Sequence, residues 1–77
     1  MRSEKELFKL ATDMFFIENK LQEHPDELVT EELKAEAKKI RNILLKKNYD
    51  VNTFLYYKEL YKTMTVAEYY AFLDTLE

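Results

Sequence analysis

The sequence of 77 residues contains no cysteine, no glycine and a single proline. Without cysteine no disulfide can form, and with only one histidine the Cys and His ligands of a structural zinc site are missing. Phosphate-binding loops and dinucleotide-binding turns ordinarily need glycine, so these nucleotide sites have no residues to form from. A single core is marginal in so short a chain. We therefore expect close helix packing, with or without a second copy or another protein to share it.

An excess of one charge and a long apolar run are also missing. The net charge of −3 gives no general attraction to nucleic acid or to anionic membranes. No apolar run approaches the length of a membrane-spanning helix, and the first residues do not resemble a secretion signal. The expected location is therefore cytoplasmic.

Groups for catalysis are scarce as well. The chain has one serine, which stands at an expected helix cap, and one histidine with no recognisable relay partner. We expect no enzymatic activity, no catalytic residues, no cofactor and no metal site. The apolar fraction of 47% and the aromatic fraction of 14% are nevertheless those of a folded protein.

The first apolar pattern predicts a long amphipathic helix over residues 4–23. Ser3 and Glu6 have the spacing of a capping box at its start, and Pro25 ends it near His24. Its apolar face covers about 160° of the helix, which is typical of a helix with a neighbour on each side. The residues of this face recur at three- and four-residue steps: Leu7, Leu10, Met14, Ile17 and Leu21, widened by Phe8, Ala11 and Phe15.

A second helix is predicted over residues 31–47, after a short turn. Asp26 and Thr30 can each cap it, and we favour a turn over residues 26–29 with the helix beginning after Thr30. Asn48 is the best residue for a left-handed C-terminal cap in a chain without glycine. The short connection predicts that the first two helices form an antiparallel hairpin.

Two shorter, aromatic-rich helices follow, at residues 51–62 and 66–76. Asp50 or Asn52 can cap the first of them, and Thr65 begins a second capping-box pattern before the last. The sequence therefore predicts an all-α fold: a single domain in which a small helical bundle is built from a long hairpin closed by two short helices.

The aromatic residues carry the main functional prediction. Most of them fall after residue 48, and a domain of this size has little interior to enclose them. Tyrosine at a surface offers a large contact area and a hydrogen bond at its tip. A tyrosine-rich core with hydrated edges is the competing interpretation. The predicted partner-binding residues are Phe16, Tyr56, Tyr57, Tyr61, Tyr69 and Tyr70.

Two polar features of the sequence are candidate sites of chemistry. Glu18 falls inside the apolar face of the first helix, so we expect either a partner such as Arg41 or exposure at the end of that face. A catalytic carboxylate with a raised pKa is the alternative. His24 and its acidic neighbours could hold a divalent cation, but the calcium-loop pattern is missing. A helix end with local hydrogen bonds is expected there.

The second helix has a local excess of positive charge. By helical angle its cations scatter around the outer face, so a solvated face is expected, and a docking patch for phosphates or an acidic protein is the alternative. The last helix has no Lys or Arg and would repel DNA in a helix-turn-helix arrangement. The cations of the second helix are Lys34, Lys38, Lys39, Arg41, Lys46 and Lys47.

These observations predict a small cytoplasmic protein-binding module without enzymatic activity, an adaptor, regulator or inhibitor that acts through an aromatic helical surface. One alternative is a structural homodimer whose short helices complete a shared core. A further alternative is a nucleic-acid-binding protein that uses the basic face of the second helix.

Overall fold

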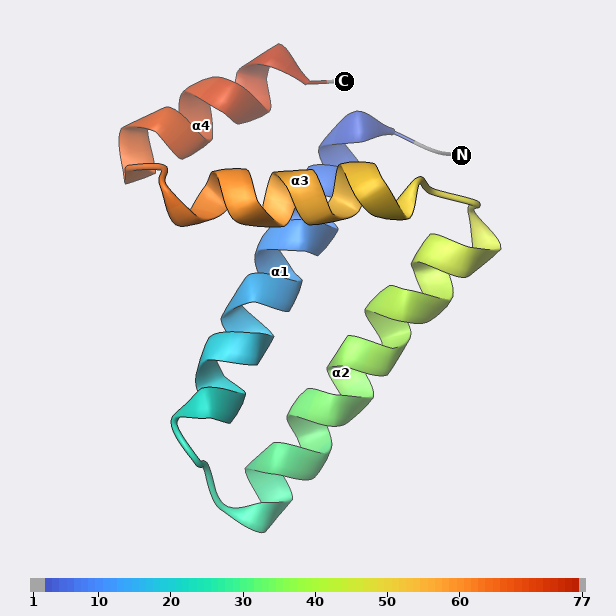
Figure 1. Ribbon diagram of the computed structural model, residues 1–77, viewed down its shortest axis with the longest axis vertical. Helices are drawn as coiled ribbons and strands as arrows, with labels where there is room; N and C mark the ends of the chain where they lie inside the picture. Colours follow the sequence, from blue (N-terminus) through green and yellow to red (C-terminus); the bar gives the residue numbers. More distant parts are fainter. Residues whose placement is uncertain (1–2, 77) are drawn as a thin grey trace.

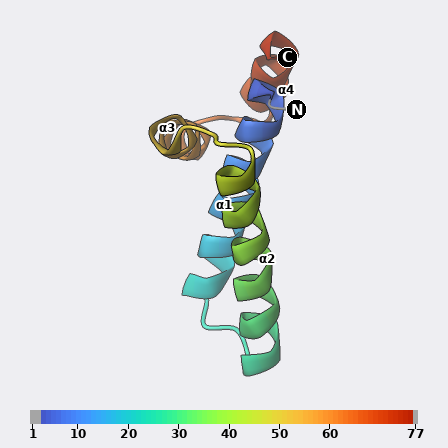
Figure 2. The same ribbon diagram turned by 90° about the vertical axis from the view of Figure 1, so that its right-hand side faces the viewer.

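The computed structural model describes residues 3–76, which form four α-helices and no strand (Figure 1). The first two helices make an antiparallel hairpin, the third crosses in front of the first, and the fourth lies beyond the third (Figures 1 and 2). The predicted all-α bundle is confirmed. The helices are α1 (Glu4–Gln22), α2 (Glu27–Lys46), α3 (Val51–Lys62) and α4 (Val66–Thr75).

Every helix begins at a polar capping residue. In each case the side chain accepts a hydrogen bond from the backbone N–H three residues further on, which satisfies a donor that the helix itself leaves unpaired. The cap of α4 is a complete capping box, as predicted, because Glu68 also accepts from the Thr65 backbone N–H. The four caps are Ser3, Asp26, Asp50 and Thr65.

The start of α2 differs from the prediction. The helix begins at Glu27, four residues before the expected start at residue 31, because Asp26 and not Thr30 is its cap. The Asp26 carboxylate accepts from the backbone N–H of Val29 at 2.9 Å. The Thr30 hydroxyl instead donates to the Pro25 carbonyl at 3.3 Å, so it is a residue of the first turn.

Among residues 3–76, two adopt positive φ, and each follows a helix of the hairpin. Asn48, with φ of 55°, is the predicted left-handed cap of α2, where the Tyr49 N–H reaches back to the Leu44 carbonyl at 2.9 Å. His24, with φ of 56°, ends α1 in the same way and was not predicted. The matching second bond cannot form after His24 because Pro25 has no N–H.

The core is organised around the phenyl ring of Phe8, which is 0% exposed. This ring meets Tyr57 of α3 edge-to-face at a centroid distance of 5.5 Å and Phe72 of α4 at 4.9 Å. Tyr61 and Tyr69 complete the ring cluster around it. The apolar face of α1 therefore has α2 on one flank and the two short helices on the other, as its predicted width indicates.

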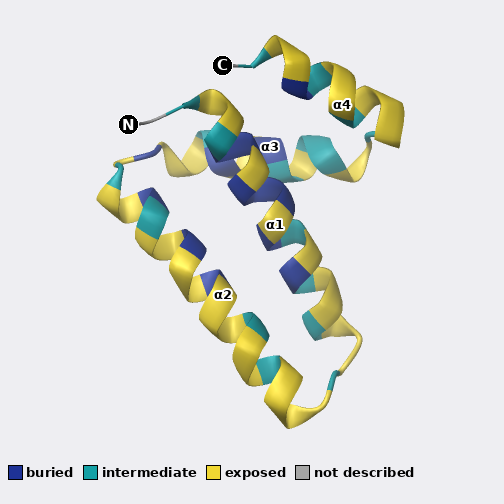
Figure 3. Ribbon diagram, turned by 180° about the vertical axis from the view of Figure 1, so that it is seen from behind, coloured by how far each residue is buried: buried dark blue, intermediate teal, exposed yellow. Residues whose placement is uncertain are grey.

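Burial is uneven across the helices. Figure 3 shows buried segments along α1 and on the facing side of α3, whereas α2 is exposed over most of its length. Along α2 only a narrow stripe reaches the core, at Ala37, Ile40 and Leu44. α2 therefore packs against the core through a narrow strip of side chains only.

The molecule is flat. Its principal extents are 38 × 30 × 17 Å, and the helices lie in little more than one layer (Figure 2). The radius of gyration is 13.1 Å, against about 11.5 Å for a compact domain of this length. A flat molecule has little interior, so large apolar side chains are exposed on every helix: Phe16, Leu28, Val29, Leu45, Val51, Leu55, Tyr56, Val66 and Tyr70.

A polar cluster ties the start of α1 to the end of α2. The Tyr49 hydroxyl accepts from the Ser3 backbone N–H at 2.9 Å and donates to the carboxylate of Glu6. Lys47 Nζ lies 2.8 Å from the other oxygen of that carboxylate. The predicted capping box at Ser3 is therefore only half formed, because Glu6 turns to Lys47 and Tyr49. These two hydrogen bonds lower the pKa of Glu6.

Replacing Phe8 by alanine should remove a large share of the stability of the fold. Truncating a fully buried phenylalanine costs about 3–5 kcal/mol, and a domain of this size has about 4–12 kcal/mol in total. Urea unfolding followed by circular dichroism measures the loss. The matched control is Leu28→Ala, an exposed side chain whose truncation should change stability by less than about 0.5 kcal/mol. Equal stability of the two variants would contradict the central role of Phe8.

The contribution of Glu6 should depend on pH. Its pKa is lowered in the folded state, so its stabilisation is present above the ordinary value of 4.5 and is lost as pH falls through the folded pKa. Glu6→Gln should therefore be less stable than wild type near neutral pH, and the difference should narrow in acid. Urea unfolding of both proteins across this range tests it. A difference that stays constant with pH would show that the carboxylate charge is not involved.

Candidate functional site

Four ring side chains from three helices form a continuous row that leads from the core to the surface. We call Phe16, Tyr61, Tyr69 and Tyr70 the aromatic row. Neighbouring rings meet edge-to-face, with centroid distances of 5.7, 5.4 and 5.3 Å along the row. Its ends are open to solvent, since Phe16 is 50% exposed and Tyr70 is 61% exposed.

The inner members of the row are fixed by the core. Tyr61 also packs edge-to-face against Phe15 at 5.4 Å, and Tyr69 lies 5.6 Å from Phe8. Edge-to-face contacts of this kind are each worth about 0.5–1.5 kcal/mol beyond simple burial. Burial raises the pKa of Tyr61, and the neighbouring hydroxyls of Tyr69 and Tyr70 raise it further. The inner part of the row is thus held in place by the core.

A small pocket opens beside the row, between the end of α3 and the start of α4. Its volume is about 180 Å³, and no charged residue lines it. Ligand sites for free small molecules usually measure about 300–1,000 Å³, so this pocket is of a size for one side chain of a partner. The lining residues are Tyr61, Met64, Thr65, Val66, Tyr69 and Tyr70.

Two predicted partner-binding residues lie outside the row. Tyr56 is exposed on α3, where its ring contacts only the neighbouring Tyr57 among the ring pairs of the described residues. Tyr57 is buried at 9% exposure, and its hydroxyl donates to Glu4 at 2.7 Å. The structure therefore makes Tyr57 a core residue, as the competing interpretation has it, and leaves Tyr56 as an isolated exposed ring.

Sequence reasoning did not identify Met64 and Val66 as part of this surface. Val66 is 75% exposed and lines the pocket. Val66 lies in the first turn of α4, whereas the contact of α4 with Phe8 of α1 is made further along the helix, by Tyr69 and Phe72. No signal in the sequence shows where that contact begins.

Glu18 finds a different partner from the one expected. Its carboxylate lies 3.0 Å from Lys58 Nζ on α3, in place of the predicted Arg41 on α2. Both Arg41 and the Glu18–Lys58 pair line a second depression of about 330 Å³, which we call the elbow groove. The elbow groove lies where α1 meets the end of α2 and the start of α3, and its lining is Met14, Glu18, Arg41, Leu44, Leu45, Val51, Phe54, Leu55 and Lys58.

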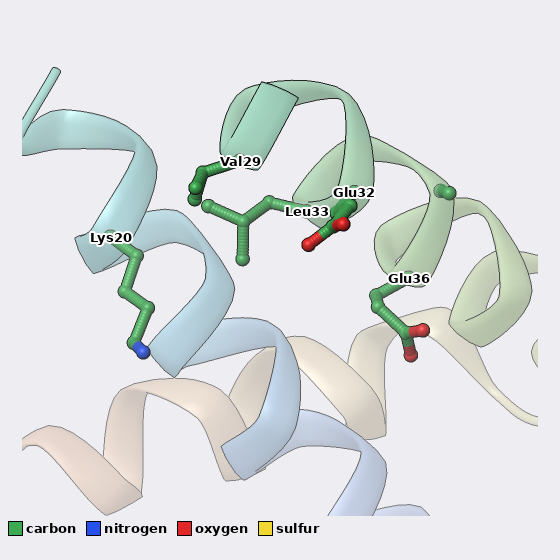
Figure 4. Close-up of a pocket in the computed structure, with 6 residues that line it drawn as sticks. Lys20, Val29, Glu32, Leu33 and Glu36 are labelled. Carbon is green, nitrogen blue, oxygen red and sulfur yellow. The ribbon is translucent and has the colours of Figure 1, made fainter. Parts of the chain in front are cut away.

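A third depression, of about 400 Å³, lies near the turn of the hairpin (Figure 4). Val29 and Leu33 of α2 supply its apolar surface, and Lys20 extends from α1. In Figure 4 the side-chain ends of Lys20 and Glu36 do not meet. This depression therefore holds neither a paired acid and base nor a convergent set of ligands.

The cations of α2 are divided among separate neighbours. Lys39 lies 3.4 Å from Glu36 on its own helix, and Lys47 is bound to Glu6 of α1. Arg41 faces the elbow groove. The use of this helix for nucleic acid stays a prediction, as does its use as a docking patch for phosphates.

In the part of the chain that the structure describes, no group of three or more His, Cys, Asp and Glu side chains is placed to hold a metal ion. None of the helices α1 to α4 has the length and apolar character needed to cross a bilayer.

No protein family, curated protein or solved structure matches this chain. A functional assignment therefore rests on the surface itself: a row of rings, an uncharged pocket and the elbow groove.

The buried hydroxyl of Tyr57 predicts loss of stability in alkali. Burial, the hydrogen bond to Glu4 and the charge of that carboxylate raise the pKa of Tyr57 from 10 to about 12. The pKa of Tyr57 is higher in the folded protein than in the unfolded chain. The stabilisation that its neutral hydroxyl provides is therefore complete below pH 10 and is lost as pH rises toward 12. Tyr57→Phe should lose less stability than wild type across this window. Urea unfolding, with tyrosinate absorbance as a second signal, measures it, and identical losses would contradict the assignment.

Proposed function

We propose that this protein is a small cytoplasmic protein-binding module without enzymatic activity, an adaptor, regulator or inhibitor, that binds another protein through the aromatic row. The observation that carries this proposal is the continuity of the row, whose outer rings are exposed and whose inner rings are fixed in the core. Exposure of such an aromatic surface to water is energetically unfavourable unless a partner covers it.

The row has the physical properties of an interface anchor. Rings held by edge-to-face contacts lose little conformational entropy on binding, and tyrosine hydroxyls supply hydrogen bonds at the edge of the contact. Binding energy in protein interfaces is concentrated in a few aromatic and arginine residues that fill pockets. The pocket beside Tyr70 would receive one such side chain from the partner.

The flat shape supports the same proposal. The described chain exposes 5705 Å², and a stable interface buries about 800 Å² on each partner. One broad side of a molecule only 17 Å thick can supply that area without any rearrangement. A partner that covers this side would also add the burial that the small core does not provide.

A photo-crosslinking amino acid placed at Tyr70 tests the proposal in the native host. It should capture a defined protein, whereas the same group placed at Leu28, which is 72% exposed in the first turn of α2, should not. Mass spectrometry identifies the captured protein. Capture of the same set of proteins from both positions would contradict a binding role for the row.

The purified partner then allows a quantitative comparison. Phe16→Ala and Tyr70→Ala should each weaken binding by about tenfold or more, which is the effect expected of interface anchors. Leu28→Ala should leave the affinity unchanged. Because these three side chains are half exposed or more, each variant should stay folded at the temperature of the measurement, which circular dichroism checks. Unchanged affinity of both ring variants would exclude the row as the contact surface.

A further inference from the structure

The elbow groove is a second exposed apolar surface, separate from the aromatic row. Buried side chains of Met14, Leu44 and Phe54 line its interior. Three aliphatic side chains that also line it are open to solvent: Leu45 at 77%, Val51 at 56% and Leu55 at 44% exposure. A groove with an apolar lining and rim of this kind fits the apolar face of a helix.

The groove carries a positive charge that no ion pair within residues 3–76 balances. Two cations line it, Arg41 and Lys58, together with one anion, Glu18. Glu18 is bound to Lys58 at 3.0 Å. Arg41 makes no ion pair with any side chain of residues 3–76. The complementary occupant is therefore a helix with an apolar face and an acidic group.

The outer face of α4 has this chemistry. Val66, Tyr70 and Asp74 follow one another at four-residue steps and are all exposed, so they form one stripe. Two exposed alanines, Ala67 and Ala71, adjoin this stripe and allow close approach. The helix contains no Lys or Arg.

Asp74 gives a second reason to expect a cation from outside. It stands in the last turn of α4, where the helix dipole is negative and where no basic residue lies. A carboxylate in this position is destabilising unless a positive charge is brought beside it. The α4 of the same chain cannot bring Asp74 to the groove, because it lies on the other side of α3 from the space between α1 and α2 (Figure 1).

We propose that the outer face of α4 docks in the elbow groove of a second copy of this chain, with Asp74 beside Arg41. Two copies related by a two-fold axis make this contact twice, so both grooves and both α4 faces are covered. This inference rests on the proposed function, since it names the protein that binds beside Tyr70: another copy of the same chain. The aliphatic rim of each groove is then buried in the dimer.

A charge exchange tests the pairing directly. Sedimentation velocity of the full chain across the micromolar range should show a monomer–dimer equilibrium. Arg41→Asp and Asp74→Arg should each weaken the dimer about tenfold, because each places like charges together. The double variant, Arg41→Asp with Asp74→Arg, should recover the wild-type dissociation constant to within a few fold. Lys34→Asp, an exposed charge change on α2 outside the groove, is the matched control and should leave the dimer unchanged.

The outcomes separate this inference from the proposed function. A chain that stays monomeric, or a folded double variant that does not recover, overturns the dimer. Species that grow continuously with concentration overturn the two-fold arrangement, because an open head-to-tail contact forms chains. A monomer whose Tyr70 position still captures another protein overturns this inference and leaves the proposed function standing. A monomer that captures nothing overturns both.

Discussion

The packing of one phenyl ring against the rings of two later helices holds this protein together. Phe8 is fully enclosed by Tyr57, Tyr61, Tyr69 and Phe72, which come from α3 and α4. Without these contacts the two short helices would have little to bind them to the hairpin, since helices of 12 and 10 residues are marginal by themselves. The same cluster extends outward as the aromatic row, so the feature that stabilises the fold also positions the surface proposed to bind a partner.

The second constraint on the structure is that the molecule is thin. Four helices in little more than one layer cannot enclose the apolar side chains that a chain this hydrophobic contains, and each helix keeps some of them in water. A chain without disulfide or metal has few other ways to gain stability. The proposed association would add stability, because it would bury the exposed rings of one side together with the aliphatic rim of the elbow groove.

Local features of the fold were predictable, and features that depend on helix crossings were not. Ser3 and Thr65 cap their helices as predicted, and Asp50, one of the two residues predicted for the third cap, takes that position. A cap bonds to the backbone only three residues away, so it can be read from the local sequence. Asp26, and not Thr30, caps α2 because the backbone of Asp26 is extended, whereas Thr30 already lies within the helix. The partner of Glu18 proved to be Lys58, because α3 crosses α1 at that level while Arg41 faces the groove.

The helical class, the number and order of the helices and the surplus of aromatic side chains follow from the sequence, since periodicity and capping are local properties of the chain. Which rings are exposed depends on how the helices pack. Tyr57 and Tyr61 are four residues apart on one helix, yet the first is buried and the second joins the aromatic row. That difference is set by the packing of whole helices and by no short stretch of sequence.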